Sequence, residues 1–171
     1  MQNENITILP ATAMSKIRKL TFSSITIALY IVIMYFAQSF AFGQYQVRIA
    51  TSLYALAGIF PFLIIPLGIA NLLSNTLMGG LGLFDIIGGF LVGILTAGSC
   101  YFLRKINVVL VALPIIFIPA LVVPIWLSYL IHVPYLVLVL SIGIGQILPG
   151  LAGVLIVKRL EKPLLRMGAG K

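Results

Sequence analysis

The chain has 171 residues, of which 61% are hydrophobic and only 8% charged, and its mean hydropathy is +1.20. Soluble domains average about 45–50% apolar and about 25% charged residues, so this composition excludes a soluble globular domain and predicts a membrane protein. Because a helix needs about 20 apolar residues to cross a hydrocarbon core about 30 Å thick, the chain has room for five or six spans joined by short loops.

The formal net charge of +8 comes from basic residues at the edges of the apolar segments. They precede the first segment, separate two later ones and close the chain, which is typical of cytoplasmic loops rather than of a nucleic-acid-binding surface. The residues in this arrangement are Lys16, Arg18, Lys19, Arg104, Lys105, Lys158, Arg159, Lys162, Arg166 and Lys171. Arg48 alone falls outside it.

Residues 1–19 are interpreted as a cytoplasmic tail, and the first span follows at about Leu20–Ala41. A signal peptide is the alternative, since Ser39-Phe40-Ala41 offers a cleavage site. The apolar run is longer than the about 7–15 residues of a signal peptide's apolar region, so we expect a retained helix.

The apolar run after the first span is interrupted by a glycine and two prolines, which permits either one kinked span or two short ones. The basic residues decide, because an odd number of crossings must separate the outer end of the first span from Arg104 and Lys105 on the inner side. We therefore predict two spans, about Ile49–Phe60 and Phe62–Leu77, the first being short for a membrane helix. The interrupting residues are Gly58, Pro61 and Pro66.

Three further spans complete a predicted all-α bundle of six transmembrane helices with both termini in the cytoplasm. They are expected at about Phe84–Leu103, Val108–Ile131 and Tyr135–Val157. The single transmembrane domain thus covers residues 20–162, and residues 163–171 form a cytoplasmic tail.

The fourth predicted helix carries Gly89, Gly93 and Ala97 on one face, four residues apart. Small residues at this spacing let two helix backbones approach closely. The partner helix is expected within this chain or in another subunit.

Polar groups inside a membrane span are costly, so each is a candidate site residue. Arg48 and Asp85 are both expected near the outer face, where they pair with each other or meet a ligand; alternatively, Arg48 reaches the lipid phosphates. Gln146 needs partners for its oxygen and its two N–H groups, from a ligand or from a neighbouring backbone. The other candidates are Asn71 and Asn75, with Gln44, Gln46, Tyr54, Trp126, Tyr129 and His132 nearer to the outer edge.

The sequence contains no catalytic or cofactor-binding motif that we recognise. Its three acidic residues form no carboxylate pair for acid–base chemistry, and no glycine-rich nucleotide loop precedes Lys-Ser or Lys-Thr. His132 and the single cysteine, Cys100, have no metal-ligand spacing, and ordinary packing is expected for the cysteine. We therefore expect no enzyme activity, no cofactor and no metal, and any energy for uphill transport must come from a partner.

Five short motifs follow one another along the chain: Phe42-Gly43 with Gln46-Val47-Arg48-Ile49, Ala70-Asn71-Leu72-Leu73, Leu81-Gly82-Leu83 with Asp85, Gly143-Ile144-Gly145, and Leu160-Glu161-Lys162. Their order and spacing resemble the QueT family, over about residues 16–162. Members of that family are substrate-binding S components of energy-coupling factor (ECF) transporters and are associated with queuosine precursors.

The resemblance implies an S component in the plasma membrane that captures a queuosine precursor of the 7-deazaguanine type at the outer face. A transmembrane coupling protein and two ABC-type ATPases would drive uptake, and small residues of the first helix, Ser24 and Ala28, would dock to them. The implied site residues are Gln46, Arg48, Asn71 and Asp85. Gln146 is added by its position, and Tyr54 and Trp126 as surfaces on which a planar ring stacks.

Two alternatives remain open at this point. One is an S component for a different vitamin-like heterocycle, and the other is a structural subunit of a membrane complex that binds no ligand. A ligand-binding component is stabilised by its ligand, whereas a structural subunit is not.

The chain departs from the family pattern at four positions. Where the family has two glutamates, this chain has Thr51 and Gln146; Pro119 stands in place of an asparagine and Gln44 in place of a proline. Loss of both carboxylates removes charge recognition of an aminomethyl group. A neutral heterocycle therefore suits this site better than a cation.

Overall fold

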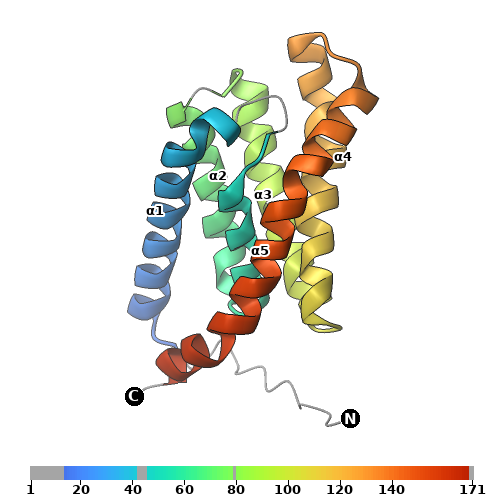
Figure 1. Cartoon of the computed structure of the whole chain (residues 1–171). Helices are drawn as coiled ribbons and strands as arrows, with labels where there is room; N and C mark the ends of the chain where they lie inside the picture. The colour runs from blue at the N-terminus through green and yellow to red at the C-terminus, as the bar shows by residue number, and fades with distance from the viewer. Residues whose placement is uncertain (1–13, 42–45, 79, 170–171) are drawn as a thin grey trace.

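The computed structural model describes residues 14–41, 46–78 and 80–169, with side chains described as far as residue 164. Over these residues the chain is helical and contains no strand (Figure 1). Five helices are long and apolar enough to cross a membrane. The α-helices are α1 (Lys16–Ala41), α2 (Ile64–Met78), α3 (Leu83–Arg104), α4 (Ala112–Ile131) and α5 (Tyr135–Ala169); the 3₁₀ helices are η2 (Ile49–Gly58), η3 (Pro61–Leu63) and η4 (Val108–Val111).

The prediction of an all-helical membrane bundle is confirmed, but the described residues form five candidate spans rather than six. The second predicted span is the 3₁₀ helix η2, whose residues 50–57 are all buried within the bundle. A 3₁₀ helix rises about 2.0 Å per residue, so η2 covers only about two thirds of a hydrocarbon core about 30 Å thick. A 3₁₀ helix can lie at membrane depth here because the surrounding helices bury it, and irregular backbone is tolerated where protein surrounds it.

Helices α2 and α3 approach each other closely through small residues. A Cβ atom added to Gly93 would lie 3.0 Å from the Cα atom of Gly68, and one added to Gly89 would lie 2.5 Å from Asn75 Nδ2. Ala97, the third residue of the predicted small face, is fully buried. This face therefore packs within the chain.

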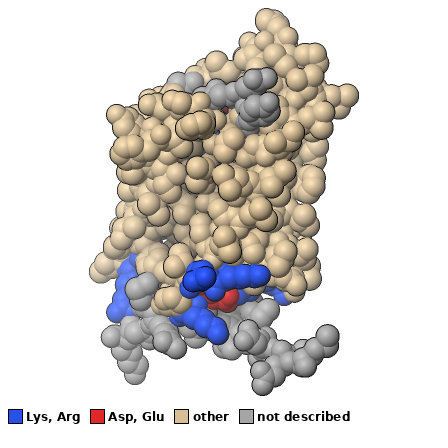
Figure 2. All heavy atoms as spheres, in the orientation of Figure 1, with Lys and Arg blue, Asp and Glu red and all other residues tan. Residues whose placement is uncertain are grey.

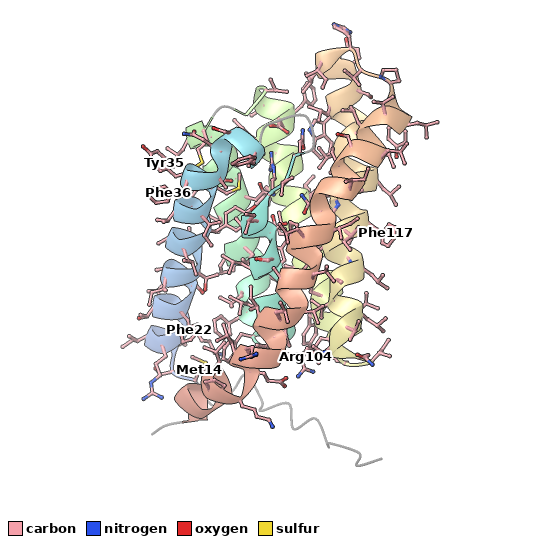
Figure 3. The ribbon with its side chains drawn as sticks, viewed as in Figure 1. Met14, Phe22, Tyr35, Phe36, Arg104 and Phe117 are labelled. Atoms are coloured by element: carbon pink, nitrogen blue, oxygen red, sulfur yellow. The ribbon has the colours of Figure 1, made fainter. Side chains whose placement is uncertain are left out.

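The two ends of the bundle differ in charge. Helix α1 begins and helix α5 ends at the same end (Figure 1), and Figure 2 shows the lysine and arginine side chains gathered there. Arg104 of α3 is buried at this end and forms an ion pair with Glu161 of α5 (Figure 3). Its aliphatic carbons lie 3.1–3.3 Å from the position of a Cβ on Gly58, so a side chain at residue 58 would crowd the arginine.

Two further expectations concern single features. Cys100 is fully buried, and its Sγ lies 3.8 Å from the carbonyl oxygen of Val111, which agrees with a packing role. Helix α5 continues through Pro163 to Ala169, so helical structure extends into the predicted C-terminal tail.

Candidate functional site

One pocket brings together the predicted substrate-binding residues. They come from η2 with the residues just before it, and from α2, α3, α4 and α5, so every α-helix except α1 contributes. Arg48 precedes one end of η2, and Gly58 at its other end touches Arg104; the pocket therefore lies away from the basic end. The predicted residues that line it are Gln46, Arg48, Tyr54, Asn71, Asp85, Trp126 and Gln146.

Two asparagines of α2 form a hydrogen-bonded ladder with α3. Asn71 Nδ2 donates to Gly89 O at 2.8 Å, and one helical turn further on Asn75 Nδ2 donates to Asp85 O at 3.0 Å. The glycine permits this contact, since a Cβ there would collide with the Asn75 amide. Both side chains are thereby held with their carboxamide oxygens turned away from α3.

Arg48 lies across these two oxygens. Its Nη1 donates to Asn71 Oδ1 at 3.3 Å and to Asn75 Oδ1 at 3.2 Å. Through Nη1 the guanidinium is thus held at the pocket wall by two neutral amide oxygens.

Asp85 lies in the first turn of α3 and is 5% exposed. Its Oδ1 accepts from Trp126 Nε1 at 3.1 Å and its Oδ2 from the backbone N–H of Leu81 at 3.3 Å. An anion is favoured at a helix N-terminus by the helix dipole. Asp85 and Arg48 thus line the same pocket, the carboxylate held by Trp126 and Leu81 and the guanidinium bonded to the two asparagines.

Gln146 of α5 has its partners in the segment around η2. Its Oε1 accepts from Thr51 Oγ1 at 2.8 Å, and its Nε2 donates to the carbonyl oxygen of Gln46 at 3.1 Å. Neighbouring protein groups therefore pair the oxygen and one of the two N–H groups of this buried amide, which also faces the pocket. Thr51 and Gln146, the two positions at which the sequence analysis expected glutamate from the resemblance, are in contact and form a single part of the pocket wall.

The sequence analysis missed Tyr30 of α1, which supports the pocket from behind. Its hydroxyl lies 3.2 Å from that of Tyr54, and the Tyr54 hydroxyl also accepts from Asn71 Nδ2 at 2.9 Å. Both tyrosines are fully buried, with ring centroids 5.8 Å apart. No signal in the sequence distinguishes Tyr30 from the other residues of this apolar helix; the structure places it, with Thr26 and Met34, on the buried stripe of α1.

The cavity between the lining residues is small. About 20 Å³ is open to the centre of a water molecule, which is room for roughly one or two waters, because about 10–15 Å³ holds one. The remaining lining is mostly apolar and includes Val92, Pro119, Val123 and Ile142. A ring-sized ligand therefore needs the walls to separate.

Other predicted residues lie elsewhere. Ser24 and Ala28 are exposed on α1, on the side away from its buried stripe. Tyr129 and His132 are exposed and do not line the pocket. Gln44 lies outside the described residues.

The comparisons with known proteins agree with a transport role. The model of a family described as QueT transporter matches residues 20–162. Neither the curated proteins nor the solved structures gave a match. Since the matched region covers most of the chain and the whole pocket, the chain belongs to the QueT transporter family.

Proposed function

We propose that this chain is the substrate-binding S component of an ECF-type importer and captures a neutral queuosine precursor of the 7-deazaguanine type. The observation that carries the proposal is a pocket, within a QueT-family membrane bundle, that is lined by a guanidinium, a carboxylate, four side-chain amides and an indole. Polar groups at membrane depth are kept for function.

The distribution of charge supports an orientation in which the basic end of the bundle faces the cytoplasm. Lysine and arginine mark cytoplasmic ends of membrane proteins, and the basic end of this bundle holds the start of α1 and the end of α5. The pocket, at the opposite end of η2, then opens toward the outer face. A plasma-membrane protein in this orientation can capture a nutrient from outside.

The charges of the pocket favour a neutral ligand. Arg48 and Asp85 are its two charged residues among the described lining, and they balance. Thr51 and Gln146 add hydrogen-bonding groups without charge. A heterocycle with both N–H donors and a carbonyl acceptor satisfies these groups, and a site of this kind rejects analogues that leave its buried polar groups unpaired.

Binding requires the pocket to open, since its present cavity has room for roughly one or two waters. The hydrogen bond from Gln146 Nε2 to Gln46 O ties α5 to the segment that precedes η2. Separation of these two walls would admit a ring between Trp126 and the opposite side of the pocket.

The exposed face of α1 supports docking to an energising partner. A smaller share of α1 is buried than of the other four spans, 22% against 39%. Ser24 and Ala28 on its exposed side are small residues at the spacing that permits close helix packing. We assign this face to the ECF coupling protein, which works with two ABC-type ATPases.

The experiment that tests the function is thermal unfolding of the purified protein in detergent with 7-cyano-7-deazaguanine, 7-aminomethyl-7-deazaguanine, queuine, guanine and B vitamins. A ligand that binds only the folded state raises its stability by RT ln(1 + [L]/Kd), about 2.7 kcal/mol at 100 times Kd. We expect a concentration-dependent shift with the cyano compound. Asp85→Asn should abolish it, whereas the control Tyr129→Phe, at an exposed residue, should keep it.

The other outcomes separate the alternatives. A shift with a vitamin and none with a deazaguanine would retain the S-component role and replace the substrate. If no compound in the panel shifts the transition, the structural-subunit interpretation takes the place of ligand capture.

A further inference from the structure

The hydrogen atoms of the Tyr30–Tyr54–Asn71 cluster can be assigned from their partners. Asn71 Oδ1 accepts from Arg48, and Asn71 Nδ2 donates to Gly89 O at 2.8 Å. The opposite orientation of this amide would set its oxygen against a carbonyl oxygen and its N–H groups against a guanidinium. The amide orientation is therefore fixed, and the second hydrogen of Nδ2 goes to the Tyr54 hydroxyl oxygen at 2.9 Å.

Two arrangements remain for the pair of tyrosine hydroxyls, which lie 3.2 Å apart. If Tyr54 donates to Tyr30, the hydrogen of Tyr30 has no acceptor among the described residues, and Tyr30 is fully buried outside the pocket lining. If Tyr30 donates to Tyr54, the hydrogen left over belongs to Tyr54, which does line the pocket. The second arrangement is favoured, because a buried donor without an acceptor is destabilising and a ligand or water in the pocket can accept from Tyr54.

We infer that Tyr30 is a positioning residue that keeps the Tyr54 hydroxyl as a hydrogen-bond donor to the ligand, so the site selects ligands with a carbonyl oxygen at that place. With Asn71 and Tyr30 both donating to it, the Tyr54 oxygen is occupied as an acceptor. Its own hydrogen then points to the cavity, where a ligand N–H in the same position would be repelled.

Asp85, one helical turn before Gly89 on α3, offers the ligand hydrogen-bond acceptors instead of a donor. Asp85 there accepts from Trp126 and Leu81, and a carboxylate has about four acceptor sites, so it has capacity for ligand N–H groups. The pocket thus presents a donor from Tyr54 and an acceptor from Asp85. One edge of 7-deazaguanine carries a carbonyl acceptor beside two donors, the ring N–H and the amino group, and therefore matches this pair of residues. This assignment of the edge rests on the proposed function.

The test compares 7-deazaguanine with 7-deaza-6-thioguanine, which keeps both N–H donor groups and replaces the carbonyl oxygen by sulfur, a weaker acceptor. Affinities are measured by calorimetry for the wild type, Tyr54→Phe and Tyr30→Phe. We expect the wild type to favour the oxygen compound roughly fivefold and Tyr54→Phe to lose this preference. Since the ratio is taken within each variant, a general loss of affinity or stability cancels.

Tyr30→Phe separates the two proton arrangements. If Tyr30 donates, the variant releases one acceptor site of the Tyr54 oxygen, so the preference for oxygen should fall to between those of the wild type and Tyr54→Phe. A wild type without preference, together with a Tyr30→Phe variant that gains one, would show that Tyr54 donates to Tyr30 and would overturn the inference.

The outcomes also distinguish this inference from the proposed function. Equal binding of both compounds by wild type and Tyr54→Phe overturns the donor role of Tyr54 and leaves deazaguanine capture standing. If the wild type binds neither compound, the function itself is wrong and the assignment of the ligand edge falls with it.

Discussion

The two arginines at opposite ends of η2, Arg104 buried and Arg48 half-buried, are held in different ways. Arg104, at the basic end, forms an ion pair with Glu161 and is 3% exposed. Arg48, at the pocket, donates to the neutral oxygens of Asn71 and Asn75, while Asp85 in the same pocket is held by Trp126. At the basic end the ion pair serves stability, whereas at the other end Arg48 and Asp85 both line the pocket, where a ligand can meet them.

Arg104→Ala is expected to have the largest effect on stability. Removal of one partner of a fully buried ion pair costs about 3–5 kcal/mol; here the cost should fall below that range, because the Glu161 side chain left without its partner is 24% exposed. The variant also leaves a space beside Gly58. We expect a marked loss of thermal stability in detergent, with the ligand affinity of the folded fraction unchanged. An unaltered unfolding temperature would show that the Arg104–Glu161 pair contributes little and would remove the contrast between the two ends.

Arg48→Ala should have the opposite result, a large loss of ligand affinity with little loss of stability. Hydrogen bonds to a charged group contribute about 1.5–3 kcal/mol, so we expect ligand affinity to fall by roughly 10- to 100-fold. Membrane insertion should be unaffected and stability only slightly lower, because Asn71 and Asn75 keep their bonds to α3. Binding measured by calorimetry at wild-type strength would exclude Arg48 from the site.

Gly89→Ala tests how far the pocket depends on close packing of α2 and α3. The added Cβ would lie 2.5 Å from Asn75 Nδ2, so the Asn75 amide must leave Asp85 O, at a cost of about 1–3 kcal/mol for the unpaired groups. Both stability and affinity should fall. Gly98→Ala on the same helix is the matched control, because nothing lies within 4 Å of its added Cβ; it should be stabilising by up to about 1 kcal/mol.

The fold was predictable where apolar length and polar loops set the boundaries. Helix α3 was expected at about residues 84–103 and runs from Leu83 to Arg104. The 3₁₀ form of η2 was not predictable, because a ten-residue apolar run carries no signal that separates a short α-helix from a 3₁₀ helix. That form depends on the helices that surround it.

The candidate site shows the same limit. Intramembrane polarity was enough to single out Arg48, Asp85 and Gln146, since such groups are costly in lipid. It was not enough for Tyr30, because α1 is apolar on all sides: Tyr30 is fully buried whereas Tyr35 is 60% exposed. In a membrane helix the lipid-facing and core-facing sides have similar composition, so packing alone separates two such tyrosines.

Gln146→Glu sharpens the comparison by adding a charge to the pocket that the wild-type chain keeps balanced. One carboxylate oxygen can still accept from Thr51, but the other replaces Nε2 and faces the carbonyl oxygen of Gln46 at about 3.1 Å, where two acceptors repel each other. A ligand ammonium group nearby would relieve this repulsion. The ratio of affinities for 7-aminomethyl-7-deazaguanine over 7-cyano-7-deazaguanine should therefore rise roughly tenfold, the change that about 1.4 kcal/mol of charge interaction produces.

Gln146→Met is the control, since it removes the amide without a charge and should weaken both ligands alike. An unchanged ratio in the glutamate variant would mean that the ligand substituent lies away from α5, and selectivity for a neutral substrate would then have to come from Arg48.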